Sequence, residues 1–245
     1  MTARQILEAL REVARADKAE FLPGFFRAIP GGYGEGDQFI GCVVPDQRRI
    51  AKQFRHLQRG QLLKLFASPW HECRLTGMLI LVLQFEQANK PRNANREEDC
   101  RDLVNFYLDN LDAVNNWDIV DTTSPKILGP WLVEHPNERD VIQSLSGSEV
   151  IWRRRVAVLA TLALIKHDQF DEIMWLAETL IDDRHDLMHK AIGWMLREMG
   201  KRDQSKLEAF LSEHAGHMPR TMLRYAIEKL SKEERVVWMN TPRSN

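Results

Sequence analysis

The sequence lacks the features that define several large classes of protein. No apolar run reaches the ~18 residues of a membrane-spanning helix, and the longest covers residues 78–83. The cysteines Cys42, Cys73 and Cys100 are odd in number and far apart, which argues against a disulfide framework and against a structural zinc site. The 13 glycines and 10 prolines are too few for a linker or a disordered chain of 245 residues. We therefore expect a globular, cytoplasmic protein without membrane contact.

An excess of charge of either sign is also missing. The chain carries 34 Lys and Arg against 35 Asp and Glu, so its formal net charge is −1. A basic protein is the usual expectation for nucleic-acid binding. However, a polyanion is attracted by the local density of cations on one face. The positions of the charges along the chain are therefore more informative than their sum.

Strand signals are scarce, whereas helical signals recur along the whole chain. The one β-like run, residues 39–44, is short and is closed by Pro45. Capping boxes begin at Thr2 and Ser231, and Ser68 with the proline after it predicts the start of a long apolar helix ending near residue 90. Gly200 is placed to terminate the helix before it. These signals predict an all-α fold.

A weak periodicity in the second half of the chain suggests helical repeats. Trp117, Arg155 and Trp194 stand about 40 residues apart, each in an apolar helix that follows a polar turn. Two-helix units of this length stack into α-solenoids of the HEAT type. A helical bundle would show much the same pattern. We predict a single HEAT-like-repeat domain over residues 1–245.

Two histidines could in principle bind a metal. His185 and His189 are one helical turn apart and could hold zinc. The metalloprotease motif requires Glu after the first histidine, where Asp186 stands, and no third ligand is evident, although His214 and His217 lie downstream. Solvent-facing histidines at a helix start are the favoured interpretation, so we expect no metal site and no cofactor. A zinc hydrolase is kept as an alternative.

The predicted helix over residues 186–200 carries a cationic stripe. Lys190, Trp194, Arg197 and Lys201 recur at helical spacing, apart from the apolar stripe that would face the core. Cations can hold phosphates while an indole packs on a sugar or a base. The alternative is that Trp194 packs beneath a neighbouring helix and the cations are only solvated. The two interpretations stay open at this point.

Two more clusters combine polar and aromatic side chains. Arg155 lies in an apolar helical stripe, where a half-buried guanidinium needs a carboxylate or a phosphate. Trp117 and Asp121 are one turn apart, so an indole and a carboxylate point into the same space, whereas Asp118 is expected on another face. A carboxylate beside aromatic walls is well suited to stabilise a developing cation. An Asp near a helix start, however, is most often a cap.

The three clusters follow the order and spacing of a known family. Trp-Asp-x-x-Asp covers residues 117–121, Ile-Trp-x-x-Arg covers residues 151–155, and Lys-Ala-Ile-Gly-Trp-x-Leu-Arg-Glu covers residues 190–198. The chain resembles the AlkD-type DNA alkylation repair family, the HEAT-like-repeat alkylpurine DNA glycosylases. Residues 39–41 and Pro-x-x-Arg-Arg at residues 45–49 also fit an early helix of that family. The motif at residues 190–198 is the most specific part of the resemblance.

The resemblance implies an α-solenoid whose concave cationic face holds duplex DNA. The implied activity is hydrolysis of the N-glycosidic bond of cationic N3- or N7-alkylated purines, with the base left in the helix. Asp121 matches the catalytic carboxylate, and Trp117 and Trp194 match the indoles beside the damaged nucleotide. Arg155 matches an arginine that helps to hold the DNA. We expect a monomer that uses neither a metal nor an organic cofactor.

Further contacts to the DNA are expected from the cationic stripe, at Lys190 and Arg197. The first part of the chain departs from the family, because the loop at residues 31–36 is longer than usual. Tyr33 and Phe66 are only possible counterparts of the family's N-terminal aromatic contacts. A non-catalytic HEAT-like protein that binds DNA structure or another protein is the alternative, and it would have no need of Asp121.

Overall fold

The computed structural model of the protein describes residues 1–243. Over these residues the chain is all-α and forms no strand, as the sequence predicts. Residues 39–43 of the β-like run form a loop, and Val44 begins a helix. A single parallel bridge, between Gln38 and Trp70, lies just before this run. No helix in this range is long and apolar enough to cross a membrane. The chain divides after Thr123 into two compact units, unit 1 and unit 2.

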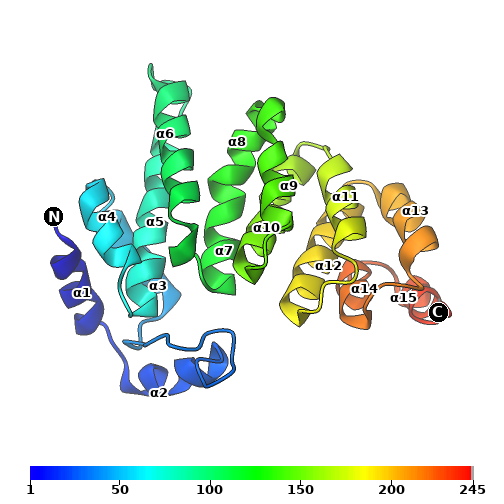
Figure 1. Cartoon of the computed structure of the whole chain (residues 1–245), viewed down its shortest axis with the longest axis horizontal. Helices are drawn as coiled ribbons and strands as arrows, with labels where there is room; N and C mark the ends of the chain where they lie inside the picture. Colours follow the sequence, from blue (N-terminus) through cyan, green and yellow to red (C-terminus); the bar gives the residue numbers. More distant parts are fainter. Residues whose placement is uncertain (244–245) are drawn as a thin grey trace. The chain divides into compact units, whose positions relative to one another are not determined.

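Unit 1 is built around one central helix, α5. Its elements are α1 (Ala3–Glu12), α2 (Ala16–Phe25), α3 (Val44–Gln53), α4 (Arg59–Phe66), α5 (His71–Ala88), α6 (Arg96–Asp109), η1 (Leu111–Ala113) and α7 (Trp117–Thr123). The central helix packs against α3, α4, α6 and α7. Every side chain of α5 from His71 to Val82 is buried, because these neighbours cover all its faces. Consecutive helices lie side by side in this unit, as in stacked helical repeats (Figure 1).

The start of α5 differs from the prediction. The first helical residue is His71 and the N-cap is Trp70, so Ser68 is not the cap. Ser68 Oγ instead accepts the backbone N–H of Trp70. The N–H of Gln38 bonds to the carbonyl of residue 69, and the N–H of His71 bonds to the carbonyl of Gln38. These bonds hold residues 69–70 extended and delay the helix.

Unit 2 is built around α10 and α12. Its elements are η2 (Ser124–Lys126), α8 (Leu128–Glu134), η3 (Pro136–Glu138), α9 (Asp140–Ser146), α10 (Ile151–Lys166), α11 (Asp171–Thr179), α12 (Asp186–Gly200), α13 (Gln204–His214), α14 (Arg220–Ala226) and α15 (Lys232–Met239). From Arg155 to Ile165 nearly every side chain of α10 is buried. Helix α10 packs against α8, α9, α11 and α12, and α12 packs against α13 and α14.

Two glycines of α12 serve close packing. A Cβ at Gly193 would overlap the Met222 carbonyl of α14, and a Cβ at Gly200 would overlap the Leu207 side chain of α13. Gly200 is the last residue of the helix and not, as predicted, the residue beyond its end. The capping boxes at Thr2 and Ser231 are confirmed. That the whole chain forms a single HEAT-like-repeat domain stays a prediction.

Candidate active site and cationic helix

A pocket of about 450 Å³ lies in unit 1, bounded by α2, the start of α3, α5 and α7. Trp117 and Asp121 both line it from α7, which confirms that the indole and the carboxylate face one space. The other lining residues are mainly apolar: Leu22, Phe25, Phe26, Cys42, Val43, Val44, Gln47, His71, Glu72, Leu75, Asp118 and Thr122. Apolar walls with a few polar groups, in a volume of ~300–1,000 Å³, are typical of ligand sites.

The Trp117 indole is held by aromatic packing. It stacks on Phe26 at a ring-centroid distance of 5.4 Å and meets Phe25 edge-on at 5.8 Å. Phe26 is itself stacked on Phe39 at 5.3 Å and lies 4.7 Å from the His71 ring. Contacts of this kind contribute about 0.5–1.5 kcal/mol each beyond burial, so the indole is fixed in one orientation.

Phe25 and Phe26 are pocket residues that the sequence analysis missed. Phe25 is 49% exposed and forms part of the pocket wall. The proposed counterparts do not line this pocket, because Phe66 is buried against Phe106. Tyr33 lies in the loop after α2, where its hydroxyl donates to the Phe25 carbonyl at 3.4 Å. The available signal was the pair of adjacent phenylalanines at the end of α2.

A buried ionic network fixes the start of α7 to α5. His71 Nε2 donates to Asp118 Oδ2 at 2.9 Å, and its Nδ1 donates to Asp37 Oδ2 at 3.1 Å. Arg74 also donates to Asp37. Burial disfavours the imidazolium, but the hydrogen bonds to the two aspartates outweigh it and raise the pKa of His71 to about 9. His71 is therefore a buried cation at neutral pH.

The loop before α3 is anchored by the same network. Burial alone would raise the pKa of Asp37, but the hydrogen bond from His71 and the charge of Arg74 hold it below the ordinary value. Asp37, at the end of the glycine-rich loop, is therefore held between two cations. Phe26 precedes this loop in the sequence and Phe39 follows it, and the two rings stack on each other.

The three carboxylates that line the pocket differ in exposure and use. The Glu72 carboxylate is 1% exposed and accepts the backbone N–H groups of residues 40–42 at 2.8–3.1 Å. Asp118 is buried against His71, and it lines the same pocket as Asp121, so the expectation that it lies on a separate face is wrong. Asp121 is half-buried. It is therefore the carboxylate with the most access to a ligand.

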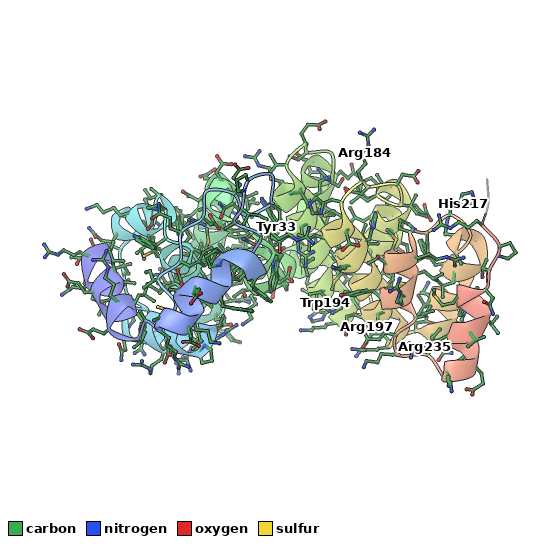
Figure 2. The ribbon with its side chains drawn as sticks, turned by 90° about the horizontal axis from the view of Figure 1, so that it is seen from below. Tyr33, Arg184, Trp194, Arg197, His217 and Arg235 are labelled. Carbon is green, nitrogen blue, oxygen red and sulfur yellow. The ribbon has the colours of Figure 1, made fainter. Side chains whose placement is uncertain are left out.

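The cationic stripe of α12 converges on one carboxylate. Trp194 Nε1 donates to Glu198 Oε1 at 3.1 Å, Arg197 Nη2 donates to the same oxygen at 3.1 Å, and Lys201 Nζ approaches both oxygens at 2.8 Å. Burial would raise the pKa of Glu198, but Lys201 and Arg197 lower it. Trp194 and Arg197 project from one edge of unit 2, and Arg184 and His217 lie on the opposite edge (Figure 2).

Trp194 is half-buried and so fits neither sequence interpretation completely. The cations around it are paired as well: Lys190 Nζ lies 2.7 Å from Asp186, and Arg197 also pairs with Glu228. A phosphate that binds here must compete with these carboxylates.

Arg155 is more deeply buried than the sequence suggests. Arg155 is only 4% exposed. Its Nη1 donates to the carbonyl of Leu187, at the start of α12, at 2.5 Å. The guanidinium therefore links α10 to α12. Its contact with DNA stays a prediction.

The two histidines that could have bound zinc, His185 and His189, form hydrogen bonds to backbone groups of unit 2. His185 is the N-cap of α12, where its Nδ1 accepts the Leu187 N–H at 3.1 Å. Burial lowers the pKa of His185. His189 Nε2 bonds to the Asp183 carbonyl at 2.5 Å. Within residues 1–243, no group of three or more His, Cys, Asp or Glu side chains is arranged to hold a metal ion.

The comparison with known families agrees with this arrangement of helices and motifs. The family model described as "DNA alkylation repair enzyme" matches residues 6–230, which is nearly the whole chain. The chain belongs to the DNA alkylation repair enzyme family. The match begins in α1 and ends after α14, so it includes both units, the pocket at Trp117 and the cationic stripe of α12.

A solved structure of this family shares the fold. It is described as a predicted DNA alkylation repair enzyme from Enterococcus faecalis, and the similarity has a TM-score of 0.67 at 18% sequence identity. The match covers 89% of this chain and 97% of that chain. No curated protein sequence matches. The DNA alkylation repair family thus assigns a role in the repair of alkylated DNA.

Proposed function

We propose that the protein is a DNA glycosylase that releases cationic N3- and N7-alkylated purines from duplex DNA and leaves an abasic site. The observation that supports it best is the pocket in unit 1, where the half-buried Asp121 carboxylate faces the same space as the Trp117 indole. Membership of the DNA alkylation repair family supports the damaged-DNA substrate. Purines of this kind include 3-methyladenine and 7-methylguanine.

The proposed chemistry suits this carboxylate. Alkylation at N3 or N7 gives the purine a positive charge, so the base departs with the electron pair of the N9–C1′ bond and needs no general acid. The sugar becomes an oxocarbenium-like cation, which Asp121 stabilises electrostatically. Water then bonds through its oxygen to C1′, and Asp121 accepts its proton. The π face of Trp117 attracts the cationic nucleotide by about 0.5–2 kcal/mol.

The cations of unit 2 are proposed to hold the DNA backbone. Lys190→Ala and Arg197→Ala should each weaken binding for every DNA sequence and should each reduce the slope of log K against log salt by about 0.9, one counterion per lost phosphate contact. Fluorescence anisotropy over a salt series measures both quantities.

The control for these two variants is Lys166→Ala, an exposed cation at the end of α10. It removes the same charge and should leave the slope at the parental value. If all three variants and the parent have the same slope, Lys190 and Arg197 do not contact phosphates. Arg155→Ala would not test this point, because Arg155 is buried and its loss would change stability as well as binding.

The experiment that tests the proposed function is incubation with a duplex that contains 7-methylguanine, followed by an assay for free base and for abasic sites. A glycosylase releases the base and makes the strand sensitive to alkali. A non-catalytic DNA-binding protein with the same cations would retain the duplex and release nothing. Binding without release would therefore overturn the proposal in favour of the scaffold.

A further inference from the structure

Unit 1 has a second cleft, at the other end of α5. It has a volume of about 1150 Å³ and lies among the C-terminal parts of α3 and α5 and the N-terminal parts of α4 and α6. Helix α5 begins with His71 at the Trp117 pocket and ends with Ala88 at this cleft. With a rise of 1.5 Å per residue, these two ends are about 25 Å apart, so the cleft is a separate site.

The lining of the cleft carries an excess of positive charge, although the chain as a whole does not. Its charged lining residues are the cations Lys52, Arg55, Arg59, Lys90 and Arg92 and the carboxylates Glu86, Asp99 and Asp102. Five cations against three carboxylates give an excess of two positive charges, whereas the whole chain has a net charge of −1. The remainder of the protein is therefore more acidic, and an anion is directed towards this cleft.

Several of these cations have no carboxylate partner. Only Arg59 forms an ion pair, with Asp102 on α6. Arg55 Nε donates to His56 Nε2 at 3.0 Å, and Lys90 Nζ donates to the Gln87 amide oxygen at 2.6 Å. Lys52, Arg55 and Arg92 are exposed, and no ion pair within residues 1–243 neutralises them. This contrasts with the stripe of α12, where the cations are paired.

Helix capping explains only part of this arrangement. Lys52 stands in the last turn of α3 and Lys90 follows α5, where cations are favoured by the helix dipole. Arg59 is the first residue of α4, where the dipole disfavours a cation, but its ion pair with Asp102 accounts for this position. Arg92 lies between the end of α5 and the start of α6, outside the terminal turns of both helices. Neither a helix dipole nor an ion pair therefore accounts for Arg92 at this cleft, and a bound anion would.

We propose that this cleft is a second binding site, which takes the phosphates of a nucleotide or of a nucleic-acid strand. Guanidinium and ammonium groups are the usual ligands of phosphate oxygens. The lining also contains Leu83, Leu103 and Gln87, which offer apolar and hydrogen-bonding surface to a sugar or a base. This site does not depend on the glycosylase proposal.

The test is isothermal titration with sodium tripolyphosphate in the absence of divalent cations. The double variant Lys52→Ala/Arg92→Ala should bind it more weakly, by about tenfold for each charge-assisted contact that is lost. The matched control is Arg48→Ala/Lys64→Ala, which removes two exposed cations of unit 1 outside the cleft. Glu86→Gln should act in the opposite direction and tighten binding, because it removes a carboxylate from the lining.

Two further arms identify the source of the phosphates. If a nucleoside triphosphate loses affinity in Lys52→Ala/Arg92→Ala and a short single-stranded oligonucleotide does not, the ligand is a free nucleotide. If the oligonucleotide loses affinity, with a salt slope lower by about 0.7 for each lost contact, the ligand is a nucleic-acid strand. Equal affinities of this variant and its control for all three probes would overturn the proposal. Thermal unfolding of both double variants separates binding from folding.

Discussion

Asp121→Asn is expected to lower the rate of base release from a 7-methylguanine duplex by about 100- to 1,000-fold, the effect of removing one well-placed electrostatic group from a transition state. Asn keeps the volume of the side chain but loses the charge that would stabilise the sugar cation. Single-turnover kinetics with enzyme in excess measure this rate without a contribution from product release. DNA affinity should change little, because phosphate contacts come from other residues.

Asp109→Asn is the matched control for this variant. Asp109 is the last residue of α6, in the same unit, and it is exposed. The substitution removes the same charge and should leave the rate of release at the parental value. If Asp121→Asn releases the base as fast as Asp109→Asn, Asp121 does not act on the sugar cation, and the pocket at Trp117 has another use.

The second large effect is expected on stability, at His71. His71→Leu would leave the buried Asp118 carboxylate without its cationic partner, whereas Asp37 would keep its ion pair with Arg74. Breaking a buried ion pair by removing one partner costs about 3–5 kcal/mol of the free energy of unfolding. Chemical denaturation at neutral pH measures this loss. The exposed His217→Leu in unit 2 is the control and should change the free energy by no more than about 0.5 kcal/mol.

The pH dependence of stability gives an independent view of the same network. A rise of the pKa of His71 from 6.5 to about 9 corresponds to about 3 kcal/mol of stabilisation. Because the folded state holds the proton more tightly, this contribution is present in full below pH 6.5 and is lost as the pH rises through about 9. Asp37 behaves in the opposite sense: its contribution is present above its ordinary pKa and is lost on acidification.

The alkaline part of this profile separates His71 from other causes. Between pH 7 and 10 the parent should lose stability, and His71→Gln, which carries no titrating proton there, should lose much less. Parallel profiles for the two proteins would show that the imidazolium does not hold α7 in place.

Local sequence patterns predicted the features that depend on a single helix. The burial of α5 and α10 follows from apolar side chains on nearly all their faces. The shared orientation of Trp117 and Asp121 follows from a spacing of one helical turn. Trp194, Arg197 and Lys201 all bond to Glu198, which is four, one and three residues away from them in the sequence. Because these contacts are local, the spacing of the four residues in the sequence would have been enough to predict them.

Features that depend on contacts between helices escaped prediction. His71 bonds to residues that lie 34 and 47 positions away in the sequence, so no local pattern connects them. A signal was nevertheless present: His71, Glu72 and Arg74 begin a helix that is otherwise apolar, and buried polar groups need partners. Phe26 was missed for a related reason, since its stacking on Trp117 depends on how α2 meets α7.

The most direct test of the central claim compares a charged and a neutral lesion in one duplex. The duplex carries 7-methylguanine and uracil at separate positions, and the parent protein is assayed for release of both bases. The account predicts release of 7-methylguanine alone, because a neutral base is a poor leaving group without protonation and loses the ~0.5–2 kcal/mol of cation–π attraction. Release of uracil at a comparable rate, or release of neither base, would contradict it.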